Sequence, residues 1–272
     1  MKNIINIFLL LLTALMFASC SKPDTVPVSG EEVTVNYSVA FPATKAQATD
    51  PVNYVWYAQY DHSTGVLLKE YTPVTVTDGK AVCPVNMIRE HSYRLVFVAQ
   101  HFELDAELKI PVYAIDAQNA LISMPLQAAA NSANYEVFVG VAEMIEYDGG
   151  NADPVELKRI VAQVNCKCTQ ASWDTFRPTS SSLTLEGVPQ SYNALTKVFS
   201  TTKVKVEYAQ KPLDDGQPCL IGMAYCFACE RISKAELTLY NDSKSVSLKA
   251  DSLPVDTNNK TNVLFTENLN NL

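Results

Sequence analysis

The sequence has few histidines and no motif that would give them a catalytic or metal-binding role. Its three histidines, His62, His91 and His101, show neither the HExxH spacing nor any other spacing of paired ligands, and no nucleophile motif accompanies them. This pattern favours structural or surface histidines. We therefore expect a protein that is not an enzyme and has no catalytic residues, no metal site and no cofactor.

Basic residues are in the minority as well. The chain has 21 Lys and Arg against 29 Asp and Glu, which gives a formal net charge of −8 at pH 7. No stripe of Lys and Arg supplies contacts to phosphates, so the sequence argues against nucleic acid as a partner. The acidic balance instead favours solubility outside the cell.

Long apolar runs are absent except near the N-terminus. Residues 4–17 form an apolar run that follows Met1-Lys2-Asn3 and is too short for a comfortable membrane span. The run ends in Phe17-Ala-Ser-Cys20, which is similar to the lipobox of bacterial lipoproteins. We expect residues 1–19 to be a lipoprotein signal peptide, Cys20 to be acylated, and residues 20–32 to be a lipidated tether. An ordinary secretory signal is the alternative.

No stretch sustains a helical period, whereas short segments with period-2 alternation recur. This pattern predicts antiparallel β-sandwiches. Residues 117–134 are rich in Ala, Gln, Asn and Ser, which is consistent with either a short helix or a long loop. The predicted strands are 33–41, 53–59, 66–71, 75–82, 93–100, 135–142, 160–166, 182–187, 204–208, 219–229, 235–240, 245–250 and 262–266.

The middle of the chain, residues 154–173, reads PVELKRIVAQVNCKCTQASW. Ile160, Ala162, Val164 and Cys166 alternate with mostly polar positions, which is typical of a half-buried strand. A loop rich in Asp and Gly precedes this strand, and a length of 272 residues favours two cores over one. The sequence therefore predicts two domains, residues 33–153 and residues 154–272.

Six cysteines follow Cys20, and their spacing leaves two interpretations open. A Cys-Lys-Cys pair and a Cys-Phe-Ala-Cys pair suggest a four-thiolate zinc site. On strands, however, the first pair shares one face while the second occupies opposite faces, which favours buried small hydrophobes with one or two disulfides in an exported protein. The spacing does not reveal how these residues pair: Cys83, Cys166, Cys168, Cys219, Cys226 and Cys229.

Several segments, taken in their order along the chain, form a more specific pattern. They are Cys20 with its tether, FPATKA (41–46), YVWYAQYD (54–61) before Leu67-Leu68, LKRIVAQVN (157–165) before Trp173-Asp174, and LPVDTNNKTNV (253–263). This order resembles the fimbrillin family of Bacteroidales, the type V pilin-like and Mfa-like surface lipoproteins that are precursors of pili and their accessory subunits.

The resemblance implies an all-β fold of two tandem transthyretin-like antiparallel β-sandwich domains. It also implies that an Arg- or Lys-specific protease removes the first strand after export, and that a strand from a neighbouring subunit fills the groove. Carried over to this sequence, the cut lies between Lys45 and Ala46. The apolar face of the removable strand consists of Val33, Val35, Tyr37, Val39 and Phe41.

The function that the resemblance implies is that of a structural or adhesive pilus or accessory subunit at the outer membrane or in a fimbrium. Its partners are then other pilin subunits, bound by β-strand addition, the outer membrane, bound through acylated Cys20, and a ligand on a host or bacterial surface. The alternative is a permanently lipidated anchor, or a receptor for glycans or host ligands, with the same fold. A receptor could stack sugars on the aromatic strand around Trp56, although alternating aromatics are more typical of a core.

Overall fold

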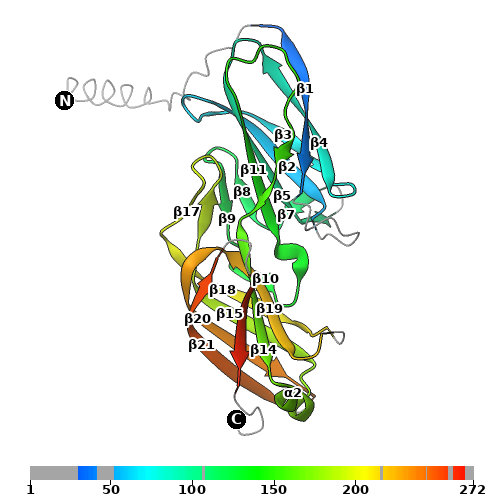
Figure 1. The fold of residues 1–272 in the computed structure, drawn as a ribbon, viewed down its shortest axis with the longest axis vertical. Coiled ribbons are helices and arrows are strands. Elements are labelled where there is room, and N and C mark those ends of the chain that lie inside the picture. Colours follow the sequence, from blue (N-terminus) through cyan, green and yellow to red (C-terminus); the bar gives the residue numbers. More distant parts are fainter. Residues whose placement is uncertain are drawn as a thin grey trace, which may run out of the picture. The chain divides into compact units, whose positions relative to one another are not determined.

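The computed structural model describes residues 30–41, 52–105, 108–214, 217–242, 244–256 and 260–266, which fold almost entirely into β-strands (Figure 1). The chain divides into Met1–Glu31 and a compact unit, Glu32–Leu272. Within the described ranges, no helix is long and apolar enough to cross a membrane.

Two sheets enclose a core built mainly from the first half of the chain. Their strand orders are β12-β1-β4 and β13-β11-β5-β2-β3. We call the hydrophobic cluster between them the β1 core; Tyr37, Met87, Leu95, Phe97 and Phe138 belong to it. The strands are β1 (Glu32–Ala40), β2 (Tyr54–Asp61), β3 (Leu67–Thr75), β4 (Lys80–Ile88), β5 (Tyr93–Gln100), β11 (Val137–Met144), β12 (Val155–Glu156) and β13 (Lys158–Arg159).

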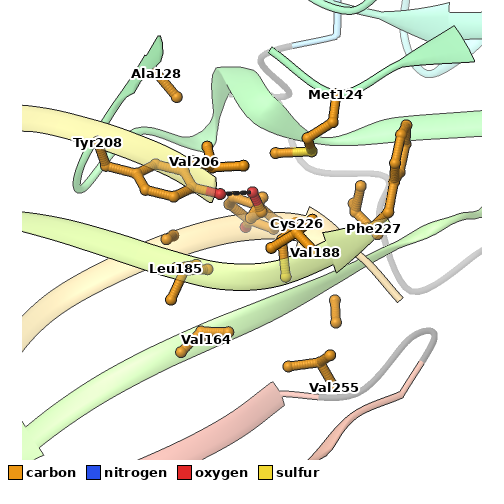
Figure 2. Close-up of a cluster of buried hydrophobic side chains, with 14 of the residues drawn as sticks. Met124, Ala128, Val164, Leu185, Val188, Val206, Tyr208, Cys226, Phe227 and Val255 are labelled. Carbon is orange, nitrogen blue, oxygen red and sulfur yellow. Dashed lines mark hydrogen bonds between the residues drawn. The ribbon is translucent and has the colours of Figure 1, made fainter. Parts of the chain in front are cut away.

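Two further sheets, with orders β10-β18-β15-β20-β21 and β19-β14-β22, enclose a second core. Figure 2 shows Val164, Leu185, Val206 and Tyr208 among the buried side chains of this core. The hydroxyl of Tyr208 donates to the carbonyl oxygen of Tyr225 at 2.6 Å, so its polar atom has a partner inside the core. The strands are β10 (Gln127–Ala129), β14 (Val161–Cys168), β15 (Ser180–Pro189), β18 (Lys203–Pro212), β19 (Leu220–Phe227), β20 (Cys229–Tyr240), β21 (Ser245–Val255) and β22 (Lys260–Phe265).

The remaining elements are short. The strands β8 (Ala114–Asp116), β9 (Leu121–Ser123), β16 (Ser191–Asn193) and β17 (Val198–Phe199) form a four-stranded sheet, and β6 (Phe102–Asp105) pairs with β7 (Leu108–Pro111). The segment 117–134 holds β9, β10 and the start of the 3-10 helix η3 (Ala133–Tyr135), rather than an α-helix or one long loop. The α-helix α2 (Gln170–Phe176), which the sequence patterns did not predict, begins where the Thr169 side chain accepts a hydrogen bond from the Ser172 N–H.

Most neighbouring strands run antiparallel, as the alternation predicts, but three pairs are parallel: β1 with β12, β10 with β18 and β14 with β22. Strands on either side of residue 154 also pair with one another, since β13 joins β11 and β16 joins β9. The predicted all-β sandwich class is confirmed. The transthyretin-like tandem and its boundary at residue 154 stay predictions.

The prediction of a strand at residues 160–166 is correct, but the prediction that only one of its faces is buried is wrong. In β14 every residue except Lys167 is buried, so both faces are covered along most of the strand, and β19 and β22 pair with its two edges. Gln163 and Asn165 lie on the face that the sequence assigns to solvent, and the Gln163 amide donates to the Asn165 Oδ1 at 2.9 Å. This hydrogen bond gives each amide a partner inside the protein, which lowers the cost of burying two polar side chains.

The strand predicted at residues 75–82 is also wrong, because the chain turns there. β3 ends at Thr75, and β4 begins at Lys80. Asp78 and Gly79 have φ values of 50° and 68°, and the backbones of Thr77 and Lys80 exchange hydrogen bonds of 2.9 and 3.0 Å. Asp-Gly with two positive φ angles is the preferred two-residue hairpin turn.

Candidate functional site

β1 is the central strand of its sheet, with β12 on one side and β4 on the other, and Figure 1 shows β4 beside β1. It pairs with β4 in antiparallel register along its whole length, from Glu32 opposite Ile88 to Ala40 opposite Lys80. On its other side it pairs with β12 in parallel register, and the Leu157 N–H donates to the Ala40 carbonyl oxygen at 3.1 Å. The backbone of β1 is therefore paired with β4 along its whole length and with β12 at its last two residues, Val39 and Ala40.

The alternating apolar residues of β1 point into the β1 core. Val35, Tyr37 and Val39 are buried, and Val33 and Phe41 are partly buried against the same cluster. The intervening residues are exposed apart from the partly buried Ala40. This is the face that the sequence assigns to the removable strand; its removal itself stays a prediction.

Tyr37 occupies the centre of this face. Its ring centroid lies 5.6 Å from that of Phe97, and its hydroxyl lies 3.9 Å from the sulfur of Met87. Burial raises the pKa of Tyr37 to about 12, so the phenol is protonated at neutral pH. At the end of the strand the ring of Phe41 meets that of Phe138 edge to face, with centroids 5.2 Å apart. These contacts form a pocket for the aromatic ring of Tyr37, with apolar residues of β1 on either side of it along the strand.

The outer edge of β4 is covered by side chains from the opposing sheet. The Tyr57 hydroxyl donates to the Pro84 carbonyl oxygen at 3.1 Å, and the Gln59 amide donates to the Asn86 carbonyl oxygen at 3.1 Å. The N–H of Asn86 in turn donates to the hydroxyl of Tyr71 at 3.0 Å. Side chains of β2 and β3 thus take the place of a neighbouring strand along this part of β4.

Tyr93 of β5 extends the same arrangement, because its hydroxyl accepts a hydrogen bond from the Ile88 N–H at 3.0 Å. We call Tyr57, Tyr71 and Tyr93 the capping tyrosines. The rings of Tyr57 and Tyr71 stack with centroids 4.8 Å apart and planes 6° apart. Burial raises the pKa of Tyr57 and of Tyr71 to about 12, so both hydroxyls keep their protons at neutral pH. The capping tyrosines anchor β4 independently of β1.

The other neighbour of β1, β12, is held against β11 at a glycine. A Cβ atom added at Gly140 would lie 2.7 Å from Val155 Cγ1, 3.0 Å from Leu157 Cδ2 and 3.3 Å from the Glu156 carbonyl oxygen. Only a residue without a side chain lets the segment 155–157 pass this close. Both flanks of β1 are therefore fixed by contacts that β1 does not make.

A buried ion pair fixes the chain just beyond β12. The guanidinium of Arg159 lies 2.9 Å from Oε1 of Glu136, with 13% and 3% of the two side chains exposed. The same guanidinium lies over the ring of Phe138, 5.5 Å from its centroid. We call β4 and β12, together with Leu95, Phe97 and Phe138 of the β1 core, the cradle of β1.

Three of the site residues named from the sequence, Cys20, Lys45 and Ala46, lie outside the described residues. Lipidation and cleavage there stay predictions. Within the described ranges, no group of three or more His, Cys, Asp or Glu side chains is arranged to hold a metal ion. The cysteines of the described part of the chain have free thiols, and Cys83, Cys166, Cys168 and Cys226 are buried.

Trp56 does not form a sugar-stacking platform. Its side chain is 5% exposed and belongs to the second core, and its indole N–H donates to Oε1 of Glu70 at 2.6 Å. The interpretation of this residue as part of a core is therefore confirmed, and a receptor that uses its ring is excluded by burial. The capping tyrosines and Gly140 were not identified from the sequence, because their partners lie far away along the chain.

Comparisons with known proteins concern the fold. No family model matches the sequence, and no curated protein matches it. Among solved structures, a fimbrial assembly protein from Parabacteroides distasonis ATCC 8503 has 11% identity and a TM-score of 0.48, with 87% of this chain and 93% of that chain covered.

Two structures from Bacteroides align with higher scores. A candidate cell adhesion protein from Bacteroides ovatus ATCC 8483 has 9% identity and a TM-score of 0.53, with 88% of this chain and 94% of that chain covered. A second one, from Bacteroides uniformis ATCC 8492, has 7% identity and a TM-score of 0.53, with coverage of 86% and 93%. This chain thus shares its all-β fold with solved Bacteroides proteins described as candidate cell adhesion proteins.

Proposed function

We propose that this chain is a surface-anchored fimbrillin-like lipoprotein, a structural or adhesive pilus or accessory subunit that assembles by strand exchange after β1 is removed. The observation that carries the proposal is the position of β1 between two strands that are anchored by other contacts. Acylated Cys20 ties the unprocessed precursor to the outer membrane. The fold shared with candidate cell adhesion proteins supports the assignment.

Removal of β1 leaves a gap that a new strand can fill. The inner edge of β4 loses its antiparallel partner along the whole of β1, and the pockets of Val35, Tyr37 and Val39 open. Burying each such side chain is worth roughly 1.5–3 kcal/mol, so the three together contribute about 5–9 kcal/mol that the empty cradle lacks. An incoming strand recovers this free energy together with the ladder hydrogen bonds.

The cradle also selects where and how the incoming strand binds. The capping tyrosines and Gln59 cover the outer edge of β4 from Pro84 to Ile88, so strand addition is directed to the inner edge. The donor must place apolar residues at alternate positions, with an aromatic ring near Phe97 and Met87 where Tyr37 lay. A slip by one residue would turn the apolar face to solvent, which fixes the register.

The proposal is tested on material recovered from the surface of the producing cell. We expect assembled, denaturant-resistant forms to begin at Ala46 by mass spectrometry, and a Lys45→Gln variant to stay monomeric with an acylated N-terminus at Cys20. Lys197→Gln, in an exposed turn with no contact to the cradle, is the matched control and should assemble normally. An acylated Cys20 at the N-terminus of every assembled form would refute strand removal and favour a permanently lipidated anchor.

A synthetic peptide of residues 31–41 gives a second measurement. Added to the cleaved protein, it should refill the cradle and block assembly. The same peptide with Tyr37 and Val39 replaced by Ser should not block assembly, because it offers the backbone ladder without the buried side chains. Equal inhibition by both peptides would argue against the pockets as the source of specificity.

A further inference from the structure

Two cysteines meet where the β14–β19 pair ends. The register of the two strands ends with Lys167 opposite Leu220, and Cys219 lies in the turn just before β19, with a φ of 68°. The N–H of Cys168 donates to the carbonyl oxygen of Cys219 at 3.0 Å. This direct backbone hydrogen bond makes the two residues neighbours in space, as a disulfide requires, since it joins Cα atoms no more than about 4.4–6.8 Å apart.

The side chains of the two cysteines also contact each other. Burial raises the pKa of the Cys168 thiol to about 12, and a side-chain hydrogen bond with Cys219 adds to the shift. The thiol of Cys219 donates to Oε1 of Gln170 in α2 at 3.3 Å. Cys168 is buried whereas Cys219 is partly exposed, so Cys219 is the thiol that an oxidant reaches first.

The other described cysteines lie in different environments. Cys83 belongs to the β1 core, the cluster on the far side of β5 from the second core. Cys166 and Cys226 are fully buried in the second core, where Figure 2 shows Cys226 among apolar side chains. Cys229 is partly exposed, but its thiol donates to the Arg231 carbonyl oxygen at 3.2 Å. The backbone hydrogen bond and the side-chain contact between Cys168 and Cys219 favour this pairing over the others that the sequence left open.

We propose that Cys168 and Cys219 form a disulfide in the mature protein. The bond joins the start of β19 to the end of β14, where α2 begins, and closes a loop of about 50 residues, long enough for a stabilising effect through the unfolded state. Formation of the bond in the cell rests on the proposed function, because export brings the chain into an oxidising compartment.

The oxidant is a disulfide, either of a small thiol or of a thiol–disulfide oxidoreductase. The Cys219 thiolate attacks one sulfur of that disulfide and forms a mixed disulfide, and the first thiol of the oxidant leaves. The Cys168 thiol then gives up its proton as its sulfur attacks the sulfur of Cys219, the Sγ–Sγ bond forms, and the second thiol of the oxidant leaves with that proton. The two protein thiols lose two electrons and two protons, and the oxidant is reduced to two thiols.

The test compares the full chain after reduction with dithiothreitol and after oxidation with oxidised glutathione. Free thiols are alkylated in denaturant, and the tryptic peptides are mapped by tandem mass spectrometry; cleavage after Lys167 separates Cys166 from Cys168. We expect two fewer alkylated cysteines after oxidation, a linked peptide between Cys168 and Cys219, and a Tm higher by about 5 °C or more.

Cys219→Ser and Cys229→Ser form a matched pair of variants, because both thiols are partly exposed and donate to an oxygen. Cys219→Ser should remove the link and the gain in Tm, while Cys229→Ser should keep both. Six alkylated cysteines beyond Cys20 after oxidation, or a link that persists in Cys219→Ser, would overturn the pairing. A disulfide that forms in vitro but is absent from protein recovered from the cell surface would overturn formation of the bond in the cell. Strand exchange is tested independently, by whether the N-terminus of the assembled protein lies at Ala46.

Discussion

Gly140 offers a direct test of whether β12 is held against the sheet independently of β1. The change Gly140→Ala places a Cβ atom 2.7 Å from Val155 Cγ1 and 3.0 Å from Leu157 Cδ2, with the Glu156 carbonyl oxygen at 3.3 Å. Valine has one stiff side-chain torsion and the third contact is backbone, so the clash is relieved mainly by moving the segment 155–157 away from β11.

The expected cost follows from two opposing effects. Inserting a methyl group into a packed interior costs about 1–3 kcal/mol. Replacing glycine also narrows the unfolded ensemble, which returns about 0.4–1 kcal/mol. The net loss in the free energy of unfolding is therefore between about 0 and 2.6 kcal/mol, or a fall in Tm of up to about 10 °C for a chain of this size.

Hydrogen exchange at a single amide shows which part of the structure Gly140→Ala destabilises. The Leu157 N–H donates to the Ala40 carbonyl oxygen, so its hydrogen exchange reports contact between β1 and the segment 155–157. We expect exchange at Leu157 to accelerate by up to about tenfold for each 1.4 kcal/mol of local destabilisation. Measuring amide exchange by mass spectrometry alongside thermal unfolding separates this local effect from global loss of stability.

Gly222→Ala is the matched control. Its Cβ atom would lie 2.7 Å from Leu237 Cδ1, the far end of a flexible side chain, and no backbone atom lies as close as at Gly140. We expect a smaller loss of stability and unchanged exchange at Leu157. Unchanged stability and protection in Gly140→Ala, or the same loss of protection in Gly222→Ala, would show that the glycine does not position β12.

Two further predictions concern charge. Glu136→Gln removes the carboxylate from the buried pair with Arg159 and should lower the free energy of unfolding by about 3–5 kcal/mol in denaturant titrations. Glu207→Gln, in an exposed pair, should have a much smaller effect, and equal losses would contradict the role of burial. The hydroxyls and backbone N–H groups of Thr64 and Ser63 donate hydrogen bonds to Asp61 and lower its pKa from 3.8 to about 2. The contribution of Asp61 to stability is therefore complete above pH 4 and is lost as the pH falls toward 2. A carboxyl titration by NMR should place the midpoint near 2, and Asp61→Asn should flatten the pH dependence between pH 4 and 2; a midpoint near 4 would contradict the hydrogen bonds.

Local patterns in the sequence were sufficient to predict strands that have one buried face or that consist almost entirely of apolar residues. β1 alternates strictly, and β5 coincides with its predicted range because its continuous apolar run is covered on both faces. The prediction failed at Thr77–Lys80, where β-branched residues surround an Asp-Gly turn and conceal it. In β14, the mutual hydrogen bond of Gln163 and Asn165 could not be read from alternation, because polar residues normally mark the exposed face.

The parts of the cradle that matter most depend on contacts between distant residues. Tyr57 and Pro84, or Gly140 and Val155, meet only after the two sheets have packed. Nothing within ten residues of Tyr71 distinguishes a tyrosine that caps a strand edge from one that fills a core. Strand identity could therefore be predicted from the sequence, whereas the fixation of both neighbours of β1 required the structure.

That fixation explains why β1 is a better candidate for exchange than a strand at the edge of a sheet. Adding a strand beside an edge such as β22 forms ladder hydrogen bonds but opens no new pockets, so it distinguishes poorly between donor sequences. Replacing β1 forms a ladder with β4 and fills the pockets of Val35, Tyr37 and Val39 in one step. The replacement is favourable only if the cradle keeps its shape while empty, and the capping tyrosines and the close packing at Gly140 supply that rigidity without any contribution from β1. In the proposed assembly, the anchors of β4 and β12 are therefore as important as the residues of the strand that is removed.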